Sequence, residues 1–221
     1  LNIYDYRVNG TSIGELGMAA YYAAAVGVPT AMVSGDVATC DEARALLGDV
    51  EVAPTKESVS WIAARCPHPT RVIERIHSAA RRAVERLDKF RPPQLASPVT
   101  VEIEYELAQD ITGLRVGLYL LTTHGEHIFT SFDTDEPEDY ERLAVRPAGR
   151  YVSRCHIPAD FLNEGRYVLG INASAFRVRR YFQDEHALTF TIDAAGAPGM
   201  QWVEPRLGPI RPRLNWKIDL Q

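Results

Sequence analysis

The stretch FRPPQLASPVTVEIEY, Phe90–Tyr105, marks the place where the sequence pattern of this 221-residue chain changes. Before it, apolar residues recur at the spacing of helices. After it, they alternate with polar residues in the two-residue period of antiparallel strands. Pro92 and Pro93 end the preceding helix and stiffen the connection, and Val99 then begins the alternating run. The stretch is therefore either a linker between domains or the point where two unlike sequences meet.

The composition limits the classes of protein to be considered. Hydrophobic residues make up 46% of the chain, which excludes a disordered protein, and a net charge of −5 argues against a general nucleic-acid binder. The longest apolar run, Met18–Pro29, is too short to span a bilayer, and no signal peptide is visible. Cys40, Cys66 and Cys155 are far apart and lack C-x-x-C spacing. We therefore expect a reduced, cytoplasmic protein without direct membrane insertion.

The N-terminal half alternates predicted strands with predicted helices. Asn9-Gly10 is a strong turn signal, Gly27 and Gly48 suit helix ends, and residues 56–66 fit either a strand or a helix. The predicted elements are strands at 3–8, 30–34 and 50–53 and helices at 13–26, 37–47 and 70–90. This order predicts an incomplete α/β segment with parallel strands over residues 1–93.

The C-terminal half contains short strands separated by turn residues. The predicted strands are 99–107, 114–121, 127–132, 151–157, 166–173 and 188–192. Such spacing is typical of an antiparallel β-sandwich, here over residues 97–221. The fold class predicted for the whole chain is therefore α+β in two parts, an incomplete α/β segment followed by a sandwich.

Two quoted segments of the N-terminal half resemble a known enzyme family. VNGTSIGELGMAAYYAAAVGVPTAMVSGD (residues 8–36) and ARALLGDVEVAPTKESVSWIAARCPHP (43–69) resemble the C-terminal portion of the zinc-dependent D-aminopeptidases associated with dipeptide transport, over roughly residues 4–100. The resemblance implies that Glu15 is one ligand of a two-zinc centre. The family's other ligands and its catalytic His belong to D-x-E-G, N-D-S-H and two further His motifs, which do not occur in this chain.

Glu15 also has a structural interpretation that needs no metal. Ser12 and Glu15 have the spacing of a capping box at the start of a helix. Two zinc ions need several converging carboxylates and imidazoles, and one Glu cannot supply them. We therefore favour the capping role, assign no catalytic residue, and expect zinc only if the remaining ligands come from an upstream segment or another chain.

The C-terminal half resembles a second family. VTVEIEYEL, VGLYLLTTHGEHIFTSFDTD, GRYVSRCHIPADFLNEGRYVLGINAS, HALTFTI and GPIRPRLNWKIDL resemble, in order and spacing, the C-terminal domain of the ATP-binding subunit of O-antigen and other polysaccharide ABC exporters. The resemblance implies a β-sandwich that recognises the exported glycan, with transporter subunits as partners and a cytoplasmic location peripheral to the inner membrane. No Walker A motif occurs, so no ATPase is predicted. One edge strand of the family pattern is missing, and the sandwich either lacks it or takes it from the N-terminal half.

Sugar recognition requires aromatic faces together with carboxylate or amide groups. The candidate carbohydrate-binding residues are Tyr181, Phe182, Trp202, Tyr140, Asp133 and Asp135. Tyr181, Phe182 and Trp202 are placed in loop-like surroundings, whereas Tyr119 and Phe132, in apolar strands, are expected in the core. Arg177, Arg179 and Arg180 either grip an anionic sugar or phosphate or simply face solvent.

Three functional hypotheses follow. The favoured one is polysaccharide recognition by the sandwich, without a cofactor and without enzymatic activity of this chain alone. The alternative is part of a zinc-dependent D-aminopeptidase, and the third is a fusion without a joint function. The sequence leaves open whether the chain forms a homo-oligomer. Both families place a strand like Val99–Tyr105 after a Pro-rich connection, and we expect it to pair within the sandwich because the downstream partner strands are present.

Overall fold

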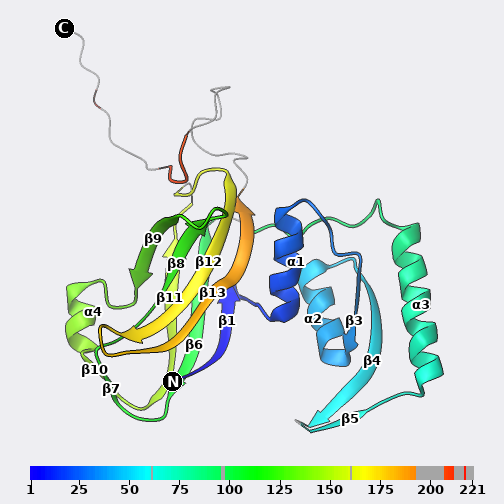
Figure 1. Ribbon diagram of the computed structural model, residues 1–221, viewed down its shortest axis with the longest axis horizontal. Coiled ribbons are helices and arrows are strands. Elements are labelled where there is room, and N and C mark those ends of the chain that lie inside the picture. The colour runs from blue at the N-terminus through cyan, green and yellow to red at the C-terminus, as the bar shows by residue number, and fades with distance from the viewer. Residues whose placement is uncertain (61, 96–97, 160, 193–206, 212–216, 218–221) are drawn as a thin grey trace. The chain divides into compact units, whose positions relative to one another are not determined.

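The computed structural model describes residues 1–60, 62–95, 98–159, 161–192, 207–211 and 217. The chain forms two compact units (Figure 1), and each is described by itself. The α/β unit comprises residues 13–94, and the sandwich unit comprises residues 1–12 together with 95–221. The fold is therefore α+β in two parts, as predicted.

The α/β unit contains a small sheet with helices. Its described elements are α1 (Glu15–Ala25), β3 (Met32–Asp36), α2 (Val37–Leu47), β4 (Glu51–Ser60), β5 (Ala63–Arg65) and α3 (Pro69–Glu85). β3 pairs with β4 in parallel, and β4 pairs with β5 in antiparallel fashion, so residues 56–66 are largely strand rather than helix. Asp36 caps α2, because its Oδ1 accepts a hydrogen bond of 2.8 Å from the backbone N–H of Thr39. No described helix combines the length and the apolar character needed to cross a bilayer.

The predicted capping box at the start of α1 is wrong. The N-cap residue is Gly14, and it makes no side-chain capping hydrogen bond. Ser12 instead lies in strand β2 (Thr11–Ser12), paired with Arg7 of β1, and its Oγ donates to Asp5 Oδ1 at 2.6 Å. Strand pairing therefore takes the serine that the spacing assigned to the helix.

In its described residues, the sandwich unit contains two four-stranded antiparallel sheets. The first has the strand order β11-β6-β1-β2 and the second has the order β13-β12-β8-β9. Their strands are β1 (Asn2–Val8), β2, β6 (Val99–Leu107), β8 (Leu114–Thr122), β9 (His127–Phe132), β11 (Gly149–Ile157), β12 (Gly165–Ala175) and β13 (Arg179–Ile192). Short strands β7 (Ile111–Thr112) and β10 (Val145–Arg146) pair with each other, and helix α4 (Pro137–Arg142) follows β9. Val116 and Leu118 of β8 line a small hollow together with Ile103 of β6, so these side chains face the first sheet.

Strand β6, on which the sequence pattern changes, lies between β1 and β11. Its alternate residues, from Val99 to Leu107, are buried, and the expected pairing within the sandwich is confirmed. The missing edge strand is supplied by β1, from the N-terminus of the chain. The structure thus divides the chain differently from the predicted boundary, because residues 1–12 belong with the sandwich. Pairing with β1 satisfies backbone groups of β6 that would otherwise form an open edge.

Tyr167 ties β12 to the short described segment 207–211. The residue is 2% exposed, and its hydroxyl lies 2.7 Å from the carbonyl oxygen of Asn163 and 2.9 Å from that of Pro209, so the two acceptors share its single proton. Burial raises the pKa of Tyr167 to about 12.

This raised pKa predicts a loss of stability in alkali. The unfolded chain releases the tyrosine proton near pH 10, whereas the folded protein retains it up to about pH 12. The contribution of Tyr167 is therefore fully present below pH 10 and is lost as the pH rises through 12. In urea unfolding at pH 9–12, Tyr167→Phe is expected to decline less steeply than the wild type, by about 2 kcal/mol across the window. Tyr22→Phe, at an exposed tyrosine, is the control. Parallel declines of Tyr167→Phe and wild type would contradict this.

Candidate functional site

The described members of the predicted carbohydrate-binding aromatic set lie on two different elements, β13 and α4. Tyr181 and Phe182 lie within β13 and not in a loop as expected, because β13 begins at Arg179, before the apolar run from which its start was predicted. Tyr140 lies on α4, where it is 65% exposed. Trp202 lies outside the described residues.

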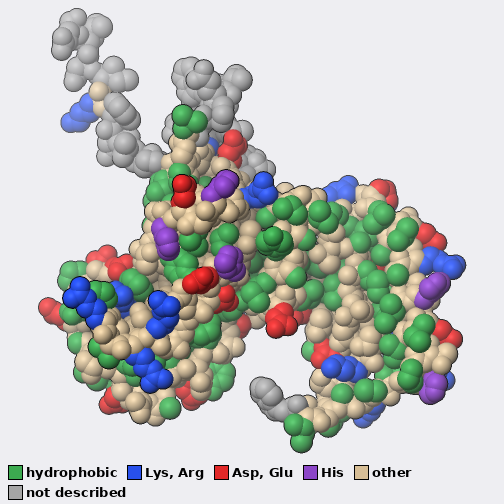
Figure 2. Space-filling model, in the orientation of Figure 1, with side chains coloured by type: hydrophobic (Ala, Val, Ile, Leu, Met, Phe, Trp, Pro, Cys, Tyr) green, Lys and Arg blue, Asp and Glu red, His purple; other side chains and the backbone are tan. Residues whose placement is uncertain are grey.

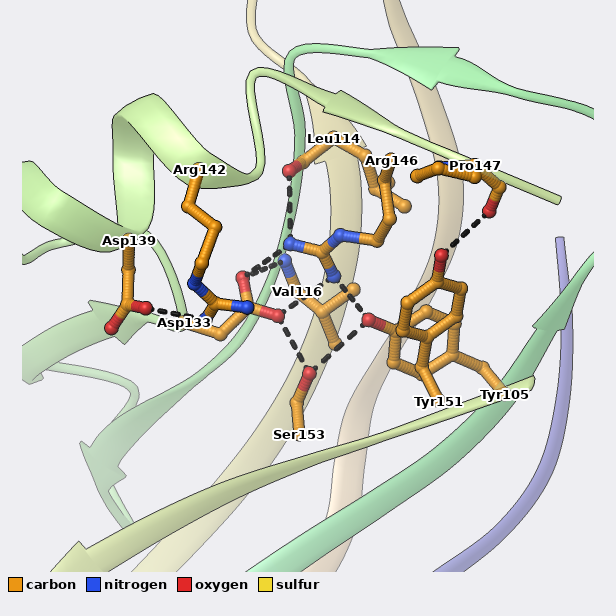
Figure 3. Close-up of polar contacts among 10 residues, drawn as sticks. All are labelled: Tyr105, Leu114, Val116, Asp133, Asp139, Arg142, Arg146, Pro147, Tyr151 and Ser153. Atoms are coloured by element: carbon orange, nitrogen blue, oxygen red, sulfur yellow. Dashed lines mark hydrogen bonds and ion pairs between the residues drawn. The ribbon is translucent and has the colours of Figure 1, made fainter. Parts of the chain in front are cut away.

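Figure 3 shows a buried ion pair of the sandwich unit and the groups that contact it. Arg146, in β10, is only 1% exposed. Its Nη1 donates to Asp133 Oδ2 at 2.8 Å and its Nη2 donates to Asp133 Oδ1 at 3.2 Å, which gives the two-point pairing that favours arginine. Nη1 also donates to the hydroxyl of Tyr105, and Nη2 donates to the carbonyl oxygen of Leu114 at 3.4 Å.

Asp133 joins the two sheets. It accepts hydrogen bonds from the backbone N–H of Val116 in β8, at 3.0 Å, and from Ser153 Oγ in β11, at 2.6 Å. The second candidate carboxylate, Asp135, accepts from Ser131 Oγ at 2.9 Å and from the backbone N–H of Phe132 at 2.8 Å. Both carboxylates are thus occupied by donors of the protein itself. Their observed role is to hold the end of β9 in place.

The outer face of the second sheet is hollowed on both sides of Tyr119. One hollow, of about 410 Å³, lies at the turn between β12 and β13, and another, of about 540 Å³, lies toward the turn between β8 and β9. Tyr119 borders both. The polar side chains around them are amide and hydroxyl groups, histidines, arginines and one carboxylate: Thr122, Thr123, Thr130, Asn172, Ser174, Gln183, His124, His127, His186, Arg115, Arg177, Arg179, Arg180 and Glu185.

Two glycines allow aromatic rings to lie against this sheet. A Cβ on Gly170 of β12 would come within 2.2 Å of the ring of Tyr119, and a Cβ on Gly117 of β8 would lie 2.7 Å from the ring of Phe132. Tyr119 is 8% exposed, so it is buried as expected, but on the hollowed face rather than toward the first sheet. Glycine inside a strand often marks a place where another group approaches the backbone closely. Gly117 and Gly170, visible in the sequence, could therefore have indicated that aromatic rings lie against this sheet.

The hydrogen-bonding groups of this face are positioned by one another. Ser174 Oγ donates to Asn172 Oδ1 at 2.9 Å, and Gln183 Nε2 donates to Glu185 Oε1 at 2.8 Å. Asn172 and Gln183 are opposite each other on β12 and β13, so the two amides share one face. Such an array can donate to and accept from several hydroxyl groups of one ligand.

In the α/β unit, a hollow of about 460 Å³ is lined by side chains of β4 and α3, among them Arg71, Glu74 and Arg75. Glu15 is exposed in the first turn of α1. Among the residues that the structure describes, no group of three or more His, Cys, Asp or Glu side chains could hold a metal ion. The described residues therefore do not fit a two-zinc centre.

Comparison with known proteins identifies the family. A family model described as D-aminopeptidase matches residues 1–116, and the chain therefore belongs to the D-aminopeptidase family. A D-aminopeptidase of Bacillus subtilis (strain 168) is 30% identical over 103 residues, which cover 47% of this chain and 38% of the relative. The chain thus spans well under half the length of that relative.

Two solved structures are similar to parts of the chain. One is the Zn-dependent D-aminopeptidase DppA from Bacillus subtilis, described as a self-compartmentalizing protease, with a TM-score of 0.43, 29% identity and coverage of 48% of this chain and 38% of that chain. The other is the C-terminal domain of wzt, with a TM-score of 0.41, 15% identity and coverage of 55% and 70%. Both families indicated by the sequence motifs are therefore among the matches.

Proposed function

We propose that the sandwich unit binds a polysaccharide on the outer face of the sheet β13-β12-β8-β9. The observation that carries this proposal is the pair of hollows that meet at Tyr119 and are lined by amide, hydroxyl and aromatic groups. A sugar chain offers C–H surfaces and many hydroxyl groups, which such side chains match. Two adjoining hollows suit an extended ligand better than a compact one.

The resemblance of the C-terminal half to polysaccharide exporters indicates where such binding would be used. It implies a glycan-recognition domain of a polysaccharide ABC exporter, working in the cytoplasm beside the transporter subunits. Within this proposal, Asn172 and Gln183 replace Asp133 and Asp135 as the polar contacts, since both carboxylates are already used by the protein. Tyr181 and Phe182 remain candidates from the same sheet, and Trp202 remains a candidate from the sequence.

Calorimetric titration with a panel of O-antigen-type polysaccharides tests the proposal. Asn172→Ala is expected to weaken binding about tenfold, because it removes hydrogen bonds worth roughly 1–1.5 kcal/mol. Asn2→Ala, at an exposed asparagine of the other sheet, is the matched control and is expected to bind like the wild type. Tyr140→Ala removes the candidate aromatic residue of α4, so binding equal to that of the wild type places the polysaccharide on the sheet and not on α4. A folded protein that binds no member of the panel would refute the proposal.

A second candidate function is participation in a zinc-dependent D-aminopeptidase. Family membership over residues 1–116 favours it. The described residues do not fit the metal centre, so this function requires ligands from outside them. Metal analysis of the purified protein, together with an assay for D-alanine release from D-Ala-D-Ala, tests it. Stoichiometric zinc with release of D-alanine would place this function ahead of polysaccharide recognition.

A further inference from the structure

The hollow at the turn between β12 and β13 is strongly cationic. Four of its lining residues are arginines, namely Arg115, Arg177, Arg179 and Arg180, and none of its lining residues is acidic. Figure 2 shows Lys and Arg side chains gathered over the end of the sandwich unit where this turn lies. The chain as a whole carries a net charge of −5, so this concentration of positive charge does not follow from a basic composition.

Three of these guanidinium groups, those of Arg115, Arg177 and Arg179, lie over aromatic rings. Arg115 lies 4.3 Å from the ring centre of Phe132 and 4.8 Å from that of Phe176. Arg177 lies 5.0 Å from the ring of Phe176. Within the described part of the chain, the ion pairs found involve other arginines and none of these four. Arg115 Nε also donates to Ser174 Oγ at 3.4 Å. Stacking on a ring orients a guanidinium without neutralising its charge.

Arg177 occupies a backbone conformation that disfavours its side chain. Its φ is +58°, in the left-handed region, and the turn is closed by a hydrogen bond of 3.0 Å from the N–H of Val178 to the carbonyl oxygen of Ala175. This third position of a turn normally favours Gly or Asn. Backbone strain of this kind concentrates at functional sites, where the side chain has a use that offsets its cost to stability.

We propose that this hollow binds an anionic substituent, a carboxylate or a phosphate, of the polysaccharide recognised by the adjoining face. The inference rests on the function proposed above and narrows its ligand to acidic glycans. Guanidinium groups bind both anions through paired hydrogen bonds. The neighbouring side chains of Asn172 and Ser174 line the same hollow and are placed to contact the hydroxyl groups of the same sugar residue.

The test compares matched glycans on the full chain. Calorimetric titration uses carboxylated polysaccharides of the panel, the same polysaccharides after reduction of their carboxylates, and phosphate-bearing members before and after dephosphorylation. The wild type is expected to bind at least one acidic form about tenfold more tightly than its neutral counterpart, with the difference shrinking as salt is added. The class of glycan that shows the difference identifies which anion is recognised.

Two variants locate the effect. Arg180→Gln is expected to weaken binding of the acidic form about tenfold and to leave the neutral form within twofold, whereas Arg150→Gln, on β11 of the other sheet, changes neither. Arg177→Gly is expected to weaken acidic binding while raising the melting temperature by a few degrees, because glycine relieves the left-handed strain. A weaker but more stable variant cannot be explained by misfolding.

The possible results separate the two proposals. Equal affinity for acidic and neutral forms, or acidic binding unaffected by Arg180→Gln and Arg177→Gly, would overturn the anionic site and leave polysaccharide recognition standing. Absence of binding to every form by a folded protein would overturn both.

Discussion

Arg146→Ala is expected to lower the free energy of unfolding of the sandwich unit by about 3–5 kcal/mol, because it leaves a partly buried carboxylate without its partner. Asp133 is 15% exposed, and its two oxygens receive both Nη groups of Arg146. The same replacement removes the hydrogen bonds to Tyr105 and to the carbonyl oxygen of Leu114. Urea unfolding followed by far-ultraviolet circular dichroism measures the loss.

Arg142→Ala is the matched control for this prediction. Its side chain donates to Asp139 within α4, but this pair is exposed and joins residues three positions apart. Exposed pairs of this kind contribute about 0–1 kcal/mol. Figure 3 shows both arginines with their carboxylate partners. Equal losses for the two variants would contradict the interpretation that the buried pair of Arg146 and Asp133 stabilises the sandwich unit more than an exposed ion pair does.

Gly117→Ala is expected to destabilise the second sheet by about 3 kcal/mol, near the upper end of the cost of overpacking. Its added Cβ would lie 2.1 Å from the backbone oxygen of Ser131 and 2.9 Å from Cα of Phe132. Gly117 and Phe132 are paired residues of β8 and β9, so the methyl group forces these strands apart. Chemical denaturation measures the effect, and weaker polysaccharide binding is expected to accompany it.

Gly14→Ala provides the comparison. There the added Cβ would come within 3.0 Å of Glu42 Oε1, the end of a flexible side chain that can move aside. We expect a change below about 1 kcal/mol, as at positions where the backbone does not have to move. If Gly117→Ala proves as mild as Gly14→Ala, the close approach of β8 and β9 is not a constraint on the fold.

Local periodicity predicted the strands of the sandwich well. The bounds predicted for 99–107 and 127–132 agree with β6 and β9, and in β6 the alternating burial is written directly into the sequence. The start of β13 was placed too late, because Arg179–Glu185 is charged and lacks a clear alternation. Its residues are strand because β12 pairs with them, which is a tertiary effect.

Contacts between distant segments could not be predicted in the same way. β1 pairs with β6 about a hundred residues away, and no local pattern states which half of the chain receives that strand. The spacing of Ser12 and Glu15 matched a capping box, but pairing of β2 with β1 overrides it. The acidic run around Asp133 gave no sign that Arg146 would bury beside it. Candidate sugar contacts were consequently chosen by residue type, whereas the hollowed face is defined by the sheet.

Hydrogen–deuterium exchange of the full chain, with and without a polysaccharide from the panel, tests the central claim most directly. The account predicts added protection in β8, β9, β12 and β13, strongest around Tyr119, Asn172 and Gln183, with residues 13–94 unchanged. Protection confined to residues 13–94, or to the sheet that contains β1, β6 and β11, would contradict it.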